Sequence, residues 1–284
     1  MSELRIPNLP GPNLPGPNLP ELHPSSSNPL RSNLPGSKDR ILYEFPHSHF
    51  CEVARWGLDY KGLSYTRQAV LPGYHAYKIK KLAPKTHVPL LYDNGIVVQG
   101  SGAILDHLQT NYPERSINAD LSQAQINAAE LDIAQAIGVP LRRLCYAHLL
   151  DKPALVRYFF MHRSSWFEKL IFRAAYPILK ARIRDTYDCT ERGAESAQRE
   201  LASALDRYDD MLSTKKYLGG GVFSRLDITF ASLAVFMVMP KQYPVQWPAA
   251  LKTMELSDWF TAQASRPSYQ HVQALYNERY AIGE

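Results

Sequence analysis

The stretch "EFPHSHFCEVARWGL", residues 44–58, decides the fold. It continues a short apolar segment, "ILYEF" at 41–45, which predicts a strand at 40–45. A turn rich in proline, serine and histidine follows. After Cys51 the apolar residues recur at helical spacing, which predicts a helix at 49–61. A strand thus ends in a polar turn from which a helix begins.

The residues that follow complete a small α/β unit. A strand at 64–70 and a short helix at 74–82 come first. Strands at 89–92 and 96–99 then flank "DNG" (93–95), a strong hairpin pattern, and a helix is expected at 101–111. A strand–helix–strand passage followed by a hairpin and a helix predicts an α/β domain at 39–113.

Beyond Leu121 the strand patterns disappear and helical periodicity takes over. Helices are predicted at 122–149, 153–187, 190–213, 225–238, 256–264 and 268–279. The sequence therefore predicts an all-helical second domain at 121–284, a helical bundle whose helices Pro140, Pro153 and Pro177 break or kink.

Residues 1–38 differ from the rest of the chain. The repeat "PNLPG" begins at Pro7, and nine of the 21 prolines lie in this segment. Proline removes backbone donors and blocks helix formation. The segment is therefore expected to be a disordered Pro-rich tail.

Composition excludes several classes of protein. Hydrophobic content of 45% and charged content of 21% are ordinary for a globular chain of 284 residues. Three cysteines without a Cys-x-x-Cys pair argue against a metal site and against a disulfide framework, and favour the cytoplasm. The net charge of +5 is scattered among acidic residues, so no nucleic-acid partner is expected. Neither a signal peptide nor a membrane-spanning segment is expected.

Two further motifs carry polar groups to strand ends. In "THVPLL" (86–91), Pro89 begins a strand; either the bond is an ordinary trans bond, or a cis bond turns the backbone groups of Val88 outward for an extended peptide. In "QGSGAILDHL" (99–108), Ser101 is expected to be a helix N-cap. The free N–H groups of such a helix start suit a carboxylate.

Taken in order, "ILYEFPHSHFCEVARWGLDYKGLSY", "APKTHVPLLYDNG" and "VVQGSGAILDHL" resemble the thioredoxin-like domain of the cytosolic glutathione transferases. "YLGGGVFSRLDITFASL" (217–233) resembles the helix-initiating segment of that superfamily, with Ser224 and Asp227 as a capping box. The serine in the turn is similar to the delta/theta-like and bacterial types. The resemblance covers about residues 40–280.

The resemblance implies a site that binds glutathione as a cosubstrate, with no tightly bound cofactor. Ser48 would be the catalytic residue, because a serine hydroxyl at a helix start stabilises the glutathione thiolate. The implied glutathione-binding residues are Thr86, His87, Val88, Pro89, Gly100 and Ser101. Gly100 departs from the family, which carries Glu, Gln or Asp there, and Gln99 could compensate only from the other face of its strand.

Other residues of the turn receive lesser roles. Cys51 is expected to be a buried structural thiol, with a nucleophilic cysteine as the alternative. Tyr43 is one residue out of place for a tyrosine-type site. His47 and His49 are expected to be exposed and incidental.

The expected activity is a glutathione transferase that conjugates or reduces a hydrophobic electrophile. The helices at 122–149 and 153–187 would line the acceptor site, with aromatic surface from Tyr146, Phe159, Phe160, Trp166 and Phe167. Residues 166–184 are interpreted as a core helix rather than a membrane-surface helix. The family implies a homodimer. A thiol oxidoreductase using Cys51 and a non-catalytic scaffold remain alternatives.

Overall fold

The computed structural model describes residues 40–73, 75–118, 121–161, 166–243, 245–251 and 254–281. The predicted disordered tail at 1–38 lies outside the described residues. Among those described, no helix is long and apolar enough to cross a bilayer.

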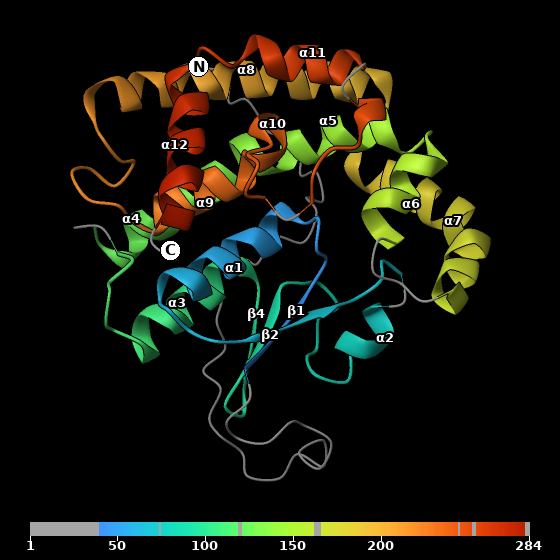
Figure 1. The fold of residues 1–284 in the computed structure, drawn as a ribbon, viewed down its shortest axis with the longest axis horizontal. Helices are drawn as coiled ribbons and strands as arrows, with labels where there is room; N and C mark the ends of the chain where they lie inside the picture. Colours follow the sequence, from blue (N-terminus) through green and yellow to red (C-terminus); the bar gives the residue numbers. More distant parts are fainter. Residues whose placement is uncertain are drawn as a thin grey trace, which may run out of the picture.

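A four-stranded sheet flanked by helices forms the first part of the described chain (Figure 1). Its elements are β1 (Arg40–Glu44), α1 (His49–Tyr60), β2 (Thr66–Ala69), α2 (His75–Ile79), β3 (Leu90–Asp93), β4 (Ile96–Gln99) and α3 (Ser101–Asn111). The strand order is β2-β1-β3-β4, in which β1 and β2 are parallel and the other pairs antiparallel. The predicted α/β, thioredoxin-like fold is confirmed, with β2 and α2 shorter than expected.

The remaining elements are helical, as predicted. They are α4 (Gln123–Ile133), the π-helix η2 (Ala134–Gly138), α5 (Val139–Leu149), α6 (Pro153–Met161), α7 (Trp166–Tyr187), α8 (Glu191–Thr214), α9 (Arg225–Leu233), α10 (Val235–Val238), the 3₁₀ turn η3 (Ala249–Leu251), α11 (Glu255–Ala262) and α12 (Pro267–Ala281). The predicted capping box of Ser224 and Asp227 starts α9.

Proline explains part of this segmentation. Pro140 lacks an N–H, and the helix passes it through the wider η2 turn immediately before α5. Pro153 begins α6, where its missing donor costs nothing. Pro177 lies inside α7 without ending it, so of the predicted break or kink the break does not occur there. The predicted helix at 153–187 is described as two helices, α6 and α7.

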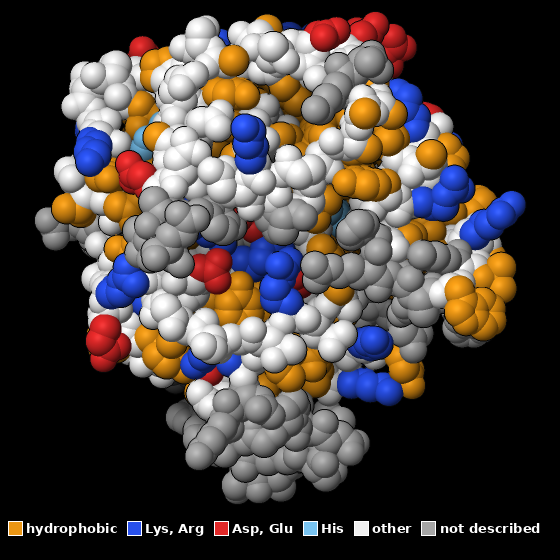
Figure 2. All heavy atoms as spheres, viewed as in Figure 1, with side chains coloured by type: hydrophobic (Ala, Val, Ile, Leu, Met, Phe, Trp, Pro, Cys, Tyr) orange, Lys and Arg blue, Asp and Glu red, His pale blue; other side chains and the backbone are white. Residues whose placement is uncertain are grey.

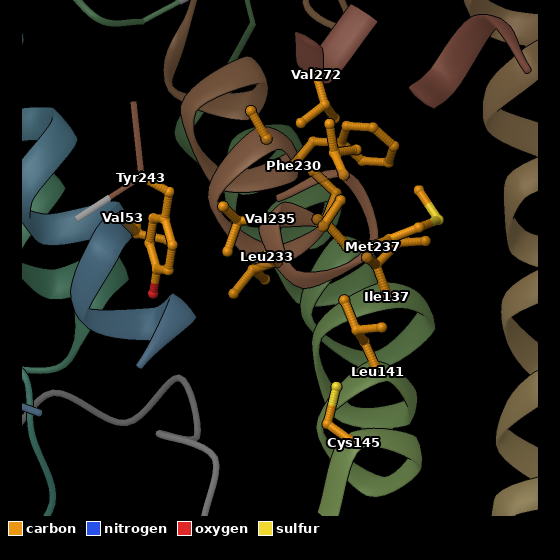
Figure 3. Packing of buried hydrophobic residues seen from close by; sticks show 14 of the residues in the cluster. Val53, Ile137, Leu141, Cys145, Phe230, Leu233, Val235, Met237, Tyr243 and Val272 are labelled. Atoms are coloured by element: carbon orange, nitrogen blue, oxygen red, sulfur yellow. The ribbon is translucent and has the colours of Figure 1, made fainter. Parts of the chain in front are cut away.

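Helix α1 lies between the sheet and the helical part of the chain (Figure 1). Ala54 and Leu58 pack towards the sheet, in a cluster with Leu42 and Leu91. On another face, Val53 belongs to the large helical core. Figure 3 shows Val53 and Tyr243 side by side at one edge of this core, whose centre is formed by α5, α9 and α10. The turn before α1 is therefore enclosed from two sides.

A buried ionic network also crosses this junction. Arg55 of α1 contacts Glu44 of β1 and donates from Nε to Glu52 Oε2 at 2.6 Å. Glu52 in turn accepts from Arg279 of α12 at 2.5 Å and from the Tyr276 hydroxyl at 3.2 Å. The side chains of Glu44, Glu52 and Arg55 are at most 2% exposed. Arg55 therefore pairs with carboxylates from a strand and a helix, and Arg279 pairs with one of them from α12.

Candidate functional site

Ser48 lies in the turn between β1 and α1. Its N–H donates to the Phe45 carbonyl at 2.9 Å, and its Oγ accepts from the Cys51 N–H at 3.3 Å. Ser48 is the N-cap of α1, in extended backbone conformation. The half-buried hydroxyl stands at the positive end of the helix dipole.

Cys51 lies one turn into α1 and its side chain is fully buried. Burial raises the pKa of its thiol to about 12, and Glu44 adds to this shift; Arg55 and the Ser48 hydroxyl oppose it only in part. Because the thiolate is the reactive form, Cys51 is protonated at neutral pH. The geometry agrees with the predicted structural thiol and gives no support to a nucleophile.

The prediction that His47 and His49 are exposed is wrong: they are 9% and 2% exposed. Helices from distant parts of the chain cover the turn. The His47 ring stacks on Phe160 of α6 with 4.6 Å between centroids, and His49 lies 5.2 Å from the ring of Phe236 in α10. Both nitrogens of His49 are buried without a hydrogen-bond partner.

The Val88–Pro89 peptide bond is cis, as the resemblance implied. The Pro89 carbonyl accepts from the Gly100 N–H at 2.9 Å, which holds the start of α3 beside this loop. Within the described residues, the backbone N–H and C=O of Val88 have no hydrogen-bond partner. Its backbone can therefore pair with an extended peptide ligand.

The start of α3 corrects one prediction. The N-cap is Gly100, not Ser101; Ser101 is the first helical residue. Gly100 has φ of +102°, a conformation that favours glycine, which explains why an acidic or amide residue is replaced there. The first helical bond runs from Ile104 N–H to Gly100, so the N–H groups of residues 101–103 are free. Such a helix start attracts a carboxylate.

Gln99 does not compensate for Gly100. Its amide Nε2 donates to the carbonyls of Lys85 and His87, at 2.9 and 2.7 Å, and so fixes the loop that carries Thr86 and His87. His87 lies beside the position that a side chain at residue 100 would take. Its buried Nε2, which has no hydrogen-bond partner among the described residues, would be 3.9 Å from a Cβ at Gly100. The loop at residues 85–88 and the start of α3 thus lie side by side, and both carry polar groups without a partner among the described residues.

Of the other residues predicted to belong to the site, some lie at the turn that carries Ser48 and others do not. Phe160 lies over the turn on His47, and Tyr146 meets Phe160 edge-on at 6.4 Å. Phe159 is core, and the side chain of Phe167 lies outside the described residues. Tyr43 packs in a small cluster with Ile79, and burial raises the pKa of its phenol.

The interpretation of residues 166–184 as a core helix is wrong for one face of α7. Trp166 is 78% exposed and Ile178 76%, with Leu170 between them. Figure 2 shows hydrophobic and basic side chains together along the right-hand edge, where α7 lies in Figure 1. The opposite face packs through Phe172.

One residue near the turn was not predicted. Arg142 of α5 lies one helical turn after Gly138, whose Cβ position would be 3.2 Å from the ring of Phe50. The guanidinium lies 5.5 Å from the centre of that same ring. In the sequence, the sign of this position is the four-residue spacing of Gly138, Arg142 and Tyr146, which puts them on one face of the helix.

Two cavities lie away from these residues. The larger, about 620 Å³, is lined by α5, α7, α8 and the loop after α5, through residues such as His148, Arg184, Glu195 and the loop residue Asp151. The smaller, about 300 Å³, lies between α4, η2 and α8. Neither shares a lining residue with the Ser48 turn or the Val88 loop. Within the described ranges no group of three His, Cys, Asp or Glu residues could hold a metal ion.

Comparison with known protein families finds a match for the first, α/β part of the chain. Residues 42–116 match the family model of the glutathione S-transferase N-terminal domain. No curated protein sequence matches the chain significantly.

Solved structures share the fold at low identity. Glutathione transferase GSTFuA3 from Phanerochaete chrysosporium has 18% identity and a TM-score of 0.62, covering 85% of this chain and 97% of that one. A glutathione S-transferase of Ceriporiopsis subvermispora, solved in complex with glutathione, has 14% identity and a TM-score of 0.59, with the same coverages. Poplar glutathione transferase F1 has 18% identity and a TM-score of 0.51, covering 84% and 99%.

Proposed function

We propose that this chain binds glutathione and activates its thiol, because residues 42–116 match the family model of the glutathione S-transferase N-terminal domain and the fold is similar to that of a solved glutathione transferase. The reaction is conjugation to, or reduction of, a hydrophobic electrophile. Glutathione is a cosubstrate. A homodimer in the cytoplasm is part of the proposal, on the family resemblance and on three free, buried cysteines.

A single arrangement carries the proposal. The bond from Gly100 N–H to Pro89 holds the free N–H groups of α3 next to the free backbone of Val88. A peptide with a carboxylate at one end and an amide in its middle satisfies both at once. The γ-glutamyl carboxylate would contact Ser101, the cysteinyl amide would pair with Val88, and Thr86 and His87 would contact the glycine end.

Ser48 would then act on the thiol. A free thiol has a pKa of about 8.5, so only a few per cent is thiolate at neutral pH. The Ser48 hydroxyl and the N-terminus of α1 stabilise the anion, and the thiol proton passes to solvent. The thiolate sulfur attacks the electrophilic atom, and the leaving group departs with the bonding electrons.

Glutathione binding is tested first, with Ser101→Ala. Removing a hydroxyl donor from a carboxylate is expected to weaken binding about tenfold, since hydrogen bonds to charged groups contribute about 1.5 kcal/mol or more. Isothermal titration of glutathione into both proteins measures the change. Absence of binding to the wild type at millimolar glutathione would overturn the proposal.

The role of Ser48 needs a separate test. Ser48→Ala is expected to keep glutathione binding while the pKa of the bound thiol rises by about one unit, because one donor to the sulfur is lost. Ultraviolet absorbance of the thiolate, titrated against pH, measures that pKa. Ser48→Thr keeps a hydroxyl and a cap and is the matched control. An unchanged thiol pKa in Ser48→Ala would remove the activating role.

A non-catalytic binding protein is the second candidate. The observation that favours it is the packing of Phe160 on His47, which covers the turn that carries Ser48. In that case glutathione would bind normally, and the thiol pKa of the complex would equal that of free glutathione.

A further inference from the structure

Arg142 is a cation without a counter-charge. Among the described residues it is the one arginine that is not exposed and has no acidic partner within 4.0 Å. Its neighbour Arg143 pairs with Glu200 at 3.0 Å. The Nε of Arg142 is buried and has no hydrogen-bond partner among the described residues. Removing this donor from water without an acceptor costs free energy.

Aromatic rings hold the guanidinium in place. Its carbon lies 4.1 Å from the centre of the Tyr187 ring and 5.5 Å from that of Phe50. Tyr146, one turn further along α5, meets the Tyr187 ring at 5.6 Å. Cation–π contacts on two sides fix the orientation of the group and offset part of its desolvation. Within the part of the chain that the structure describes, they leave the Nε donor without an acceptor.

The cage lies at the turn where the thiol would be activated. Phe50 is two residues after Ser48, and Phe160 joins Tyr146 to His47 on the other side. The ring of His49 lies 4.7 Å from that of Phe50; it is 2% exposed, and neither nitrogen has a hydrogen-bond partner among the described residues. Polar atoms without partners therefore cluster within an aromatic surface, which is the composition of a site for an aromatic ligand with one charged group.

We propose that Arg142 binds the carboxylate of an aromatic acceptor, so that the acceptor substrates are electrophilic aryl carboxylates. A carboxylate matches the fork of a guanidinium, and an aryl ring matches Tyr146, Tyr187 and Phe160. The inference deepens the proposed function, because it names the substrate class of the same site. Binding of the carboxylate itself requires no glutathione.

A matched pair of probes tests the reaction. In 4-chloro-3-nitrobenzoate and 4-chloro-3-nitrobenzamide, the thiolate sulfur forms a bond to the ring carbon and chloride leaves with the electron pair. The wild type is expected to prefer the benzoate, and Arg142→Gln is expected to lower kcat/KM for the benzoate at least tenfold and for the amide less than twofold. Arg143→Gln, one residue away, should change neither. Equal losses for both probes in Arg142→Gln would overturn the proposal.

Binding is measured without catalysis by titrating unreactive 3-nitrobenzoate into the protein in the absence of glutathione. The wild type and Arg143→Gln should bind it, Arg142→Lys should retain part of the affinity, and Arg142→Gln should lose at least tenfold. Circular dichroism identifies a variant that fails to fold, and Arg142→Lys then carries the comparison. Nitrobenzoate binding without glutathione binding would refute the proposed function and keep this site; no nitrobenzoate binding to the wild type would refute the site alone.

Discussion

Arg55→Met is expected to lower the free energy of unfolding by about 3–5 kcal/mol, the range for removing one partner of a buried ion pair. The variant leaves Glu44 and Glu52 at 0% exposure with less compensating charge. Burial by itself raises the pKa of Glu52, and Arg55 and Arg279 outweigh burial to hold it below its usual value. Methionine reproduces the unbranched part of the side chain as far as Nε, so the loss reports removal of the guanidinium, its charge together with its volume.

Urea unfolding followed by circular dichroism measures this loss. Arg67→Met is the matched control, since Arg67 also donates to Glu44, at 2.7 Å, but its side chain is 30% exposed. It should cost about 1 kcal/mol or less, because water replaces part of the interaction. If Arg55→Met and Arg67→Met lower the free energy of unfolding by the same amount, the buried network does not stabilise the packing of β1, α1 and α12 against one another.

The sequence predicted correctly those elements and caps that depend on residues close together in the chain. The strand at 40–45, the helix that begins at residue 49 and the capping box at Ser224 each depend on side chains close in the sequence, and each is confirmed. The family resemblance then supplied the thioredoxin-like fold class, which local pattern alone does not contain.

The wrong predictions for the two histidines have one physical cause. His47 and His49 stand in a polar turn, and their burial depends on Phe160 and Phe236, more than 100 residues away. A single sequence does not show which distant helix covers a turn. The wrong cap at Ser101 has a different cause. Gly100 has a positive φ and is itself the N-cap, one residue before Ser101. The glycine in front of the predicted helix was the sign of this in the sequence.

The buried histidines make acid stability the second large effect. Burial lowers the pKa of His47 to about 3 and that of His49 well below its ordinary value, with Arg142 and His47 adding to the shift of His49. Below a pH of about 6.5 the unfolded chain therefore binds protons that the folded chain does not. Stability is complete above that pH and is lost as the pH falls towards the folded values.

Each histidine contributes about 2 kcal/mol to the loss between pH 7 and pH 5, at about 1.4 kcal/mol per pH unit below the unfolded pKa. The wild type should lose about 4 kcal/mol from the pair over this window. In His49→Phe the decrease should be about 2 kcal/mol smaller, because a phenyl ring fits between Phe50 and Phe236 and cannot take up a proton.

Chemical denaturation at pH 7 and pH 5 measures both values. His148→Phe is the control: its histidine is half-buried, so its pKa is lowered by burial and by Lys152 but the ring is still reached by water. That variant should change the pH dependence less than His49→Phe does. A wild-type protein equally stable at both pH values would mean that the two imidazoles take up protons inside the fold. Helices α6 and α10 would then have to open over the turn, because the described packing leaves no counter-charge there for two cations.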